Sequence, residues 1–216
     1  MDIAIESGAQ IIDNFNYFPS SVYRTNVPQY LEAVKEVALS HATANKNDVN
    51  ELYPVKMTDN IYGDERISEF CQNTIQFAWN ILEGQGYNLE NLQTYYQSMW
   101  MQEHYHSSGM EKHIHASGTQ LVGFYFLEVP EDSSRLVLHD PRSGKVQIDL
   151  EEKNVEEVTL ATQMINFQPK AGELYFTNAW LPHSFTRNGS DEPLRFIHIN
   201  IGLQSAPHNC NLPTII

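Results

Sequence analysis

Short apolar runs follow one another through the second half of the sequence, and they restrict the fold more than any other feature. About eight runs between residues 94 and 202 are rich in aromatic and β-branched residues: TYYQSMWMQ, EKHIHAS, TQLVGFYFLEV, SRLVLHD, KVQIDL, ATQMINFQ, GELYFTNAW and PLRFIHINIG. Clusters of Gly, Pro, Asn, Asp and Ser separate them, as turns between strands require. Strands without intervening helices predict a mainly β (α+β) fold, a jelly roll of two sheets with N-terminal helices packed on its outer face.

Two helices are predicted in the first half of the chain. Residues 28–41 place apolar side chains at helical spacing and begin with a proline, which suits a first helical turn. Residues 66–82 follow the i, i+3, i+4 rule and end at Gly84, and Cys71 falls on their apolar face. The polar stretch 42–65 between them has no period and is predicted to be a loop.

Length and charge limit the classes of partner. The 216 residues are expected to form a single domain, with a helical support region at 1–90, a β core at 91–203 and a tail at 204–216. Thirteen basic against 27 acidic residues give a formal charge of −14, which disfavours nucleic acid and anionic membranes as partners. Two cysteines and an N-terminus without signal-peptide character favour a cytoplasmic location. A homodimer is left open.

Three of the nine histidines form a pattern that is typical of a metal site. His113 and His115 are one residue apart, so an extended chain would put both imidazoles on one face of a strand. His183 follows about seventy residues later, and a jelly roll brings an early strand beside a late one. His113, His115 and His183 are therefore predicted to form a three-ligand site with positions open for substrate or O₂. The rival pair at 104 and 106 is expected at a solvated turn, with His106 kept as an auxiliary candidate.

Arg195 is a cation in an otherwise apolar strand. Side-chain alternation puts it on the same face as Ile197 and Ile199, and that apolar face is the better candidate for the inner face of the barrel. A buried guanidinium is costly unless an anion pairs with it, and a carboxylate can do so with two hydrogen bonds. Arg195 is thus predicted to bind a carboxylate ligand; the alternative is a structural ion pair with an internal acid.

The order of these residues resembles the Fe(II)/2-oxoglutarate-dependent dioxygenases, especially the prolyl-hydroxylase-like branch. The segments that carry the resemblance are HIHASGTQLVGFYFLEVPEDSSRLVLHDPR and GELYFTNAWLPHSFTRNGSDEPLRFIHINI. The resemblance implies a double-stranded β-helix, iron bound by His113 and His183, and 2-oxoglutarate held by Arg195. His115 stands where this superfamily usually has a carboxylate, so the ligand set would be three neutral imidazoles.

Two further residues are candidates for roles at such a site. Tyr125, on the strand after the histidine pair, could hydrogen-bond a bound oxo acid, although a core role is the common one for an aromatic residue there. Asp140 could supply the missing carboxylate from a neighbouring strand. Its expected role, however, is to fix a turn together with Arg142.

Three functions of different classes follow. The first is an oxygenase that uses Fe(II) and 2-oxoglutarate to hydroxylate a small-molecule or peptidyl substrate, with release of succinate and CO₂. The second is a cupin-type metal enzyme that acts on a small molecule without 2-oxoglutarate; Thr119 and Gln120, where cupins commonly have a glutamate, argue mildly against it. The third is a jelly-roll binding module without catalytic activity.

Overall fold

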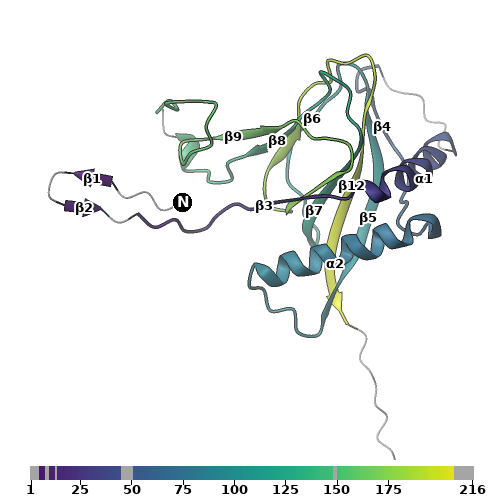
Figure 1. The fold of residues 1–216 in the computed structure, drawn as a ribbon, viewed down its shortest axis with the longest axis horizontal. Coiled ribbons are helices and arrows are strands. Elements are labelled where there is room, and N and C mark those ends of the chain that lie inside the picture. The colour runs from purple at the N-terminus through teal and green to yellow at the C-terminus, as the bar shows by residue number, and fades with distance from the viewer. Residues whose placement is uncertain (1–4, 8–9, 13, 45–50, 148–149, 207–216) are drawn as a thin grey trace, which may run out of the picture.

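Two antiparallel β-sheets face each other, and two helices cover the outer face of the larger sheet in this computed structural model (Figure 1). The structure describes residues 5–7, 10–12, 14–44, 51–147 and 150–206. Within those ranges, no helix is long and apolar enough to cross a membrane. The segment 207–216, which makes up most of the predicted tail, lies outside the described residues.

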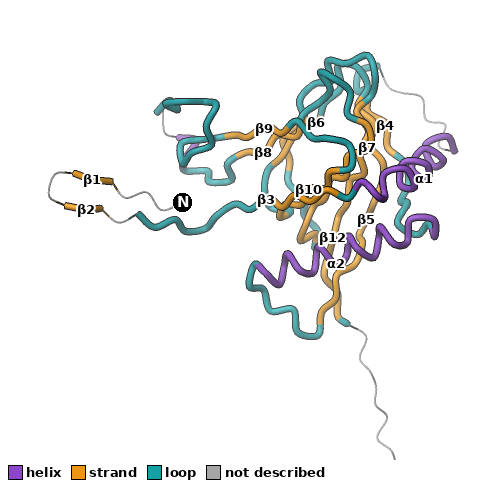
Figure 2. The backbone as a smooth tube through the Cα atoms, in the orientation of Figure 1, coloured by secondary structure: helices purple, strands orange, loops and turns teal. Residues whose placement is uncertain are grey.

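The strands divide into a six-stranded sheet, a four-stranded sheet and a separate hairpin (Figure 2). The larger sheet has the order β3 (Val22–Asn26), β10 (Glu173–Asn178), β7 (Thr119–Glu128), β12 (Leu194–Ser205), β5 (Leu92–His104) and β4 (Val55–Met57). The smaller sheet has the order β6 (Met110–His113), β11 (His183–Phe185), β8 (Leu136–His139) and β9 (Met164–Phe167). The hairpin consists of β1 (Ile5–Ser7) and β2 (Gln10–Ile12) and projects away from the sheets (Figure 1).

Both predicted helices form close to their predicted bounds. A 3₁₀ turn, η1 (Pro28–Tyr30), leads into α1 (Leu31–Ala44), and η2 (Glu65–Ile67) leads into α2 (Ser68–Gly84). The second helix buries Phe70, Cys71, Thr74, Ala78 and Leu82, which is the face that the sequence periodicity predicts.

Alternation along the central strands creates two separate apolar cores. On β7, Leu121, Tyr125 and Leu127 pack toward the helices, whereas Phe124 and Phe126 pack toward the four-stranded sheet. The core between the sheets is aromatic, because rings from both sheets meet there: Phe185 of the smaller sheet is in edge contact with Phe124 and stacks on Phe196 of the larger sheet. The candidate site lies on this inter-sheet side.

Several strands differ from the sequence prediction. β4 falls inside the predicted loop 42–65, and β3 and β11 were not predicted; all three are short, with three to five residues. The predicted strand KVQIDL is wrong over its first half, where Lys145–Gln147 form a 3₁₀ turn, η3. Short strands gain their hydrogen bonds from neighbours distant in sequence, so local periodicity does not reveal them.

Candidate metal centre

Three imidazoles converge at the inter-sheet face of the smaller sheet. The nitrogen atoms that His113, His115 and His183 can offer to a metal lie within 4.8 Å of one another. Their rings are in mutual contact, with centroids 4.5 to 5.2 Å apart. The structure therefore brings together the three histidines that the sequence singles out, from positions seventy residues apart.

Strand register explains the convergence. β6 and β11 are antiparallel, and His113 on β6 lies directly opposite His183 on β11. The strand ends at His113, so His115 does not share a strand with it, contrary to the prediction. Instead, the backbone N–H of His115 donates to the carbonyl of Ala179, 3.0 Å away, which holds the residue beside β11. His113 thus reaches His183 as its cross-strand partner, and His115 reaches it from a loop held beside β11. The two histidines do not share one strand face.

Backbone carbonyls fix the ring orientation of two of the histidines. The Nδ1–H of His113 donates to the carbonyl of Glu111 at 2.7 Å, and the Nδ1–H of His183 donates to the carbonyl of Leu181 at 3.1 Å. A carbonyl can only accept, so the lone pair of each ring is left on Nε2. This arrangement is the usual outer support of a metal-ligating histidine. The Nε2 atoms of His115 and His183 are buried without a hydrogen-bond partner, which fits a set of ligands for a divalent ion.

Burial keeps His115 and His183 in the neutral form that a metal needs. His183 is fully buried, and desolvation lowers its pKa to about 3. Burial likewise lowers the pKa of His115 to about 4, and the nearby His113 adds to the shift. Because both pKa values lie below the physiological range, neither ring has to lose a proton before it binds a metal.

A cavity of about 160 Å³ adjoins the cluster. Its lining residues come from both sheets: Met57, Trp100, Gln102, Met110, His113, His115, Phe185 and His198. Within the described part of the chain, no Arg, Lys, Asp or Glu lines it. A ligand in this cavity would therefore contact the metal site on one side and a neutral, largely aromatic wall on the others.

Arg195 points away from this cavity, so the predicted inward orientation is wrong. The face it shares with Ile197 and Ile199 is the one covered by the helices, and both isoleucines belong to the helix-side core. Its Nε donates to Oε1 of Glu103 at 2.7 Å, and its Nη1 donates to Oε2 of Glu128. An apolar face is not necessarily the inside of a barrel when helices bury the outside as well. Arg195 therefore forms a structural ion pair with internal acids, which is the alternative that the sequence analysis gives.

Tyr125 lies on the same helix-side face and does not reach the cluster. Its ring packs on Phe70 at 4.8 Å between centroids, and its hydroxyl donates to the carbonyl of Val27 at 3.0 Å. The expected hydrogen bond to a bound oxo acid does not fit this position. Tyr125 is a core residue that ties β7 to the start of the helical region.

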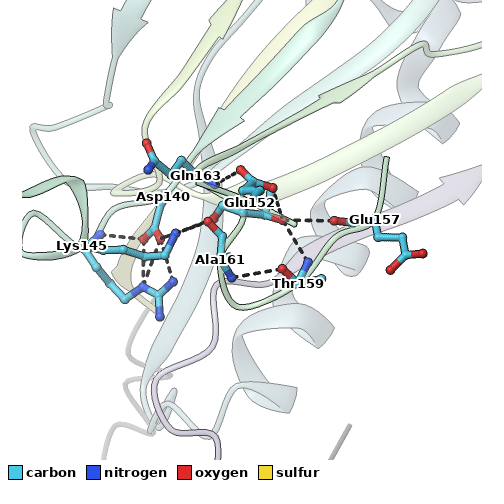
Figure 3. Close-up of polar contacts among 9 residues, drawn as sticks. Asp140, Lys145, Glu152, Glu157, Thr159, Ala161 and Gln163 are labelled. Atoms are coloured by element: carbon cyan, nitrogen blue, oxygen red, sulfur yellow. Dashed lines mark hydrogen bonds and ion pairs between the residues drawn. The ribbon is translucent and has the colours of Figure 1, made fainter. Parts of the chain in front are cut away.

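Asp140 fixes a turn and is not among the clustered ligands. Its carboxylate accepts from the backbone N–H of Arg142 at 3.0 Å and from the same residue's guanidinium at 2.7 Å. Lys145 lies beside it at 3.6 Å, within the polar network of the 140–163 segment (Figure 3). These cations hold the pKa of Asp140 at about 2. The turn role predicted for Asp140 and Arg142 agrees with this geometry.

The two histidines of the rival pair, His104 and His106, lie in different environments: the first is buried and the second is exposed. His104 ends β5 and is fully buried, which contradicts the predicted solvated turn; its ring accepts from Gln102 and contacts Ser134. His106 is exposed and lies near Asp191, so it cannot serve the cluster as an auxiliary ligand. The strand continues two residues beyond the predicted end, and this extension carries His104 into the core.

Two residues at the site were not predicted from the sequence. His198, 4% exposed, has its ring centroid 5.0 Å from that of His115, and Trp100 stacks on it at 4.3 Å. The signal was present, because alternation puts His198 on the face opposite to Ile197 and Ile199. Sequence alternation predicts that face to be the outer one, so it does not place His198 at the site.

Comparison with known proteins supports the fold and the family. The family model described as "Putative 2OG-Fe(II) oxygenase" matches residues 98–200, which include all three clustered histidines. No curated protein matches the sequence.

Several solved structures share the fold at low sequence identity. The epimerase SnoN from nogalamycin biosynthesis, described as non-heme and alpha-ketoglutarate-dependent, has a TM-score of 0.59 and 14% identity over 87% of this chain and 79% of its own. A Pseudomonas putida prolyl-4-hydroxylase has a TM-score of 0.59 and 13% identity over 85% of this chain and 92% of its own. AviO1 from Streptomyces viridochromogenes Tue57 has a TM-score of 0.60 and 13% identity over 87% of this chain and 92% of its own. These matches confirm the predicted jelly roll as the double-stranded β-helix fold of the 2-oxoglutarate oxygenases, and residues 98–200 resemble the 2OG-Fe(II) oxygenase family.

Proposed function

We propose that the chain is an iron- and 2-oxoglutarate-dependent oxygenase that hydroxylates a small-molecule or peptidyl substrate. The observation that carries the proposal is the cluster of His113, His115 and His183, with buried, unpaired Nε2 atoms on two of its members, inside the matched family region. Bound iron would supply the activation of O₂, coupled to decarboxylation of 2-oxoglutarate to succinate and CO₂.

The residues of this chain would orient the metal and exclude water. The carbonyls of Glu111 and Leu181 fix two imidazoles, so little reorganisation is needed when a metal binds. Phe124 packs edge-on against His183 at 5.3 Å and closes the inner side of the cluster. Three neutral ligands leave both charges of a divalent ion uncompensated, which favours anionic ligands at the open positions.

Hydroxylation is one of several reaction types that are named among the similar structures. The similar structures include a prolyl-4-hydroxylase, an epimerase and a carbocyclase, so the shared fold is compatible with several outcomes of the oxidation.

A second candidate is a cupin-type enzyme that uses a three-histidine metal site directly on a small molecule. Two observations favour it: among the described residues, the cluster contains no carboxylate and no cationic side chain lines the adjoining cavity to bind a dicarboxylate. The two candidates differ in whether 2-oxoglutarate binds and is consumed.

Succinate formation separates them. The protein is incubated with Fe(II), 2-oxoglutarate and O₂ without a prime substrate, and slow uncoupled turnover is measured as succinate. We expect His115→Ala to lose both metal binding and succinate formation, while Asp140→Asn keeps both, because Asp140 is engaged in its turn. Metal binding without 2-oxoglutarate binding or succinate would refute the oxygenase proposal and favour the cupin-type enzyme. A protein that binds no Fe, Mn, Co or Zn would be a binding module.

A further inference from the structure

Buried polar atoms without partners gather around the cavity beside the metal cluster. Seven buried side-chain nitrogen or oxygen atoms lack a hydrogen-bond partner among the described residues, and four of them belong to the metal cluster or to the cavity wall: His115 Nε2, His183 Nε2, His198 Nδ1 and Trp100 Nε1. A buried polar atom without a partner costs roughly 1–3 kcal/mol, so such atoms are rare unless a ligand satisfies them. A metal accounts for the two Nε2 atoms of the cluster. It does not account for Trp100 and His198.

Trp100 and His198 form one rigid unit on the wall of the cavity. They are direct cross-strand partners on β5 and β12, and their rings are stacked at 4.3 Å with an angle of 7° between planes. Both line the cavity that His113 and His115 also line. Stacking explains where the rings lie, but it leaves one nitrogen of each ring unpaired.

The chemistry of these two nitrogens suits an anion. An indole N–H can only donate, and a neutral imidazole donates from one nitrogen, so a carboxylate could accept a bond from each ring. Hydrogen bonds to an ionised acceptor are about twice as strong as bonds between neutral groups. The described part of the chain offers no cation on the cavity wall, and Arg195 is engaged with two glutamates on the other face of the sheet.

We infer that Trp100 Nε1 and His198 Nδ1 hold the far carboxylate of the metal-bound 2-oxo acid, as neutral donors in place of a cation. The inference rests on the proposed function. It also predicts limited selectivity, since two neutral donors discriminate less strongly against an uncharged tail than a guanidinium would.

The test compares two 2-oxo acids on the Zn(II)-loaded protein by calorimetry. 2-Oxoglutarate carries the far carboxylate and 2-oxobutanoate does not, whereas both present the same 2-oxo acid end to the metal. Trp100→Phe keeps an aromatic ring in the stack and removes the N–H. We expect Trp100→Phe to lower the affinity for 2-oxoglutarate about ten-fold or more. The affinities for 2-oxobutanoate and Zn(II) should stay unchanged. Tyr125→Phe, on the helix side of the sheet, is the matched control and should change none of these affinities.

A direct signal of the hydrogen bond comes from the indole protons. The chain has three tryptophans, so its ¹⁵N spectrum contains three indole N–H peaks, and Trp100→Phe assigns the relevant one. That peak should move downfield with 2-oxoglutarate and much less with 2-oxobutanoate. If Trp100→Phe does not fold, His198→Phe keeps a ring in the stack, removes the second nitrogen and should give the same selective loss.

Each contrary result has a distinct meaning. Equal affinity of the parent protein for both acids, unchanged 2-oxoglutarate affinity in Trp100→Phe, or an equal loss for both acids would overturn the inference and leave the proposed function standing. Failure of the Zn(II)-loaded parent to bind either acid would overturn the proposed function and the inference with it.

Discussion

Replacing Arg195 by Met tests whether this cation serves the fold or the site. The side chain, 23% exposed, bridges Glu103, 5% exposed, and Glu128, 27% exposed. Its loss leaves the Glu103 carboxylate buried without its cation, while Glu128 keeps Lys35 at 2.6 Å. Breaking a fully buried pair costs roughly 3–5 kcal/mol and breaking an exposed pair about 1 kcal/mol or less. For this partly exposed pair we expect a loss of about 2–3 kcal/mol in the free energy of unfolding.

The assay is urea unfolding of the apo protein, with thermal unfolding as a second measure. A loss of that size corresponds to roughly 4–12 °C in Tm for a chain of this length. Arg195→Met combined with Glu103→Gln should recover much of the loss, because the uncompensated charge is then absent. Arg195→Lys should recover only part, since one ammonium does not reproduce the two-armed contact. Arg24→Met removes an exposed arginine that pairs with Glu173 at 3.8 Å and should change stability far less.

Ligand affinities test the alternative, that Arg195 binds a ligand at the site. Metal and 2-oxoglutarate affinities of the folded Arg195→Met protein should match those of the parent, because the guanidinium lies on the helix side of the sheet. A variant with parental stability and a ten-fold or larger loss of 2-oxoglutarate affinity would refute this reasoning and restore Arg195 as a ligand-binding residue.

Three further outcomes follow from the structure. Zn(II) at 100 times its Kd should stabilise the parent by about 2.7 kcal/mol, read as a rise in Tm; His183→Gln should abolish the rise, and His106→Gln, an exposed control, should keep it. Tyr125→Phe should lower the free energy of unfolding by about 1–2 kcal/mol through the lost bond to Val27 without changing metal affinity; an unchanged stability would contradict the assigned hydrogen bond. Burial lowers the pKa of His104 to about 4 from its ordinary value of about 6.5, so the unfolded state binds more protons between these pH values. Stability therefore falls as the pH drops from 6.5 to 4, by about 3 kcal/mol from this residue. The apo His104→Gln protein should show a shallower decline over that window, and an equal decline would place the acid sensitivity elsewhere.

Elements with a strong local pattern could be predicted from the amino-acid sequence. The apolar period of residues 66–82 appears as the buried face of α2, and the runs around Phe124 and Phe196 form long central strands. In both cases one stretch of chain carries enough periodic burial to define its own structure. The spacing of His113, His115 and His183 similarly identified the residues that cluster, because few patterns combine close and distant histidines ahead of apolar strands.

Which face of each strand points toward the site depends on tertiary packing and could not be predicted from local sequence. The sheet that carries Arg195 is buried on both faces, by helices on one side and by the second sheet on the other, so hydrophobicity alone does not distinguish inside from outside. For that reason the sequence predicts the isoleucine face to be the inner one and places Arg195 and Tyr125 at the site. In the structure, Trp100 and His198 on the opposite face line the cavity instead. The meeting of His113 with His183 likewise depends on the β6–β11 register, which arises from pairing between distant segments.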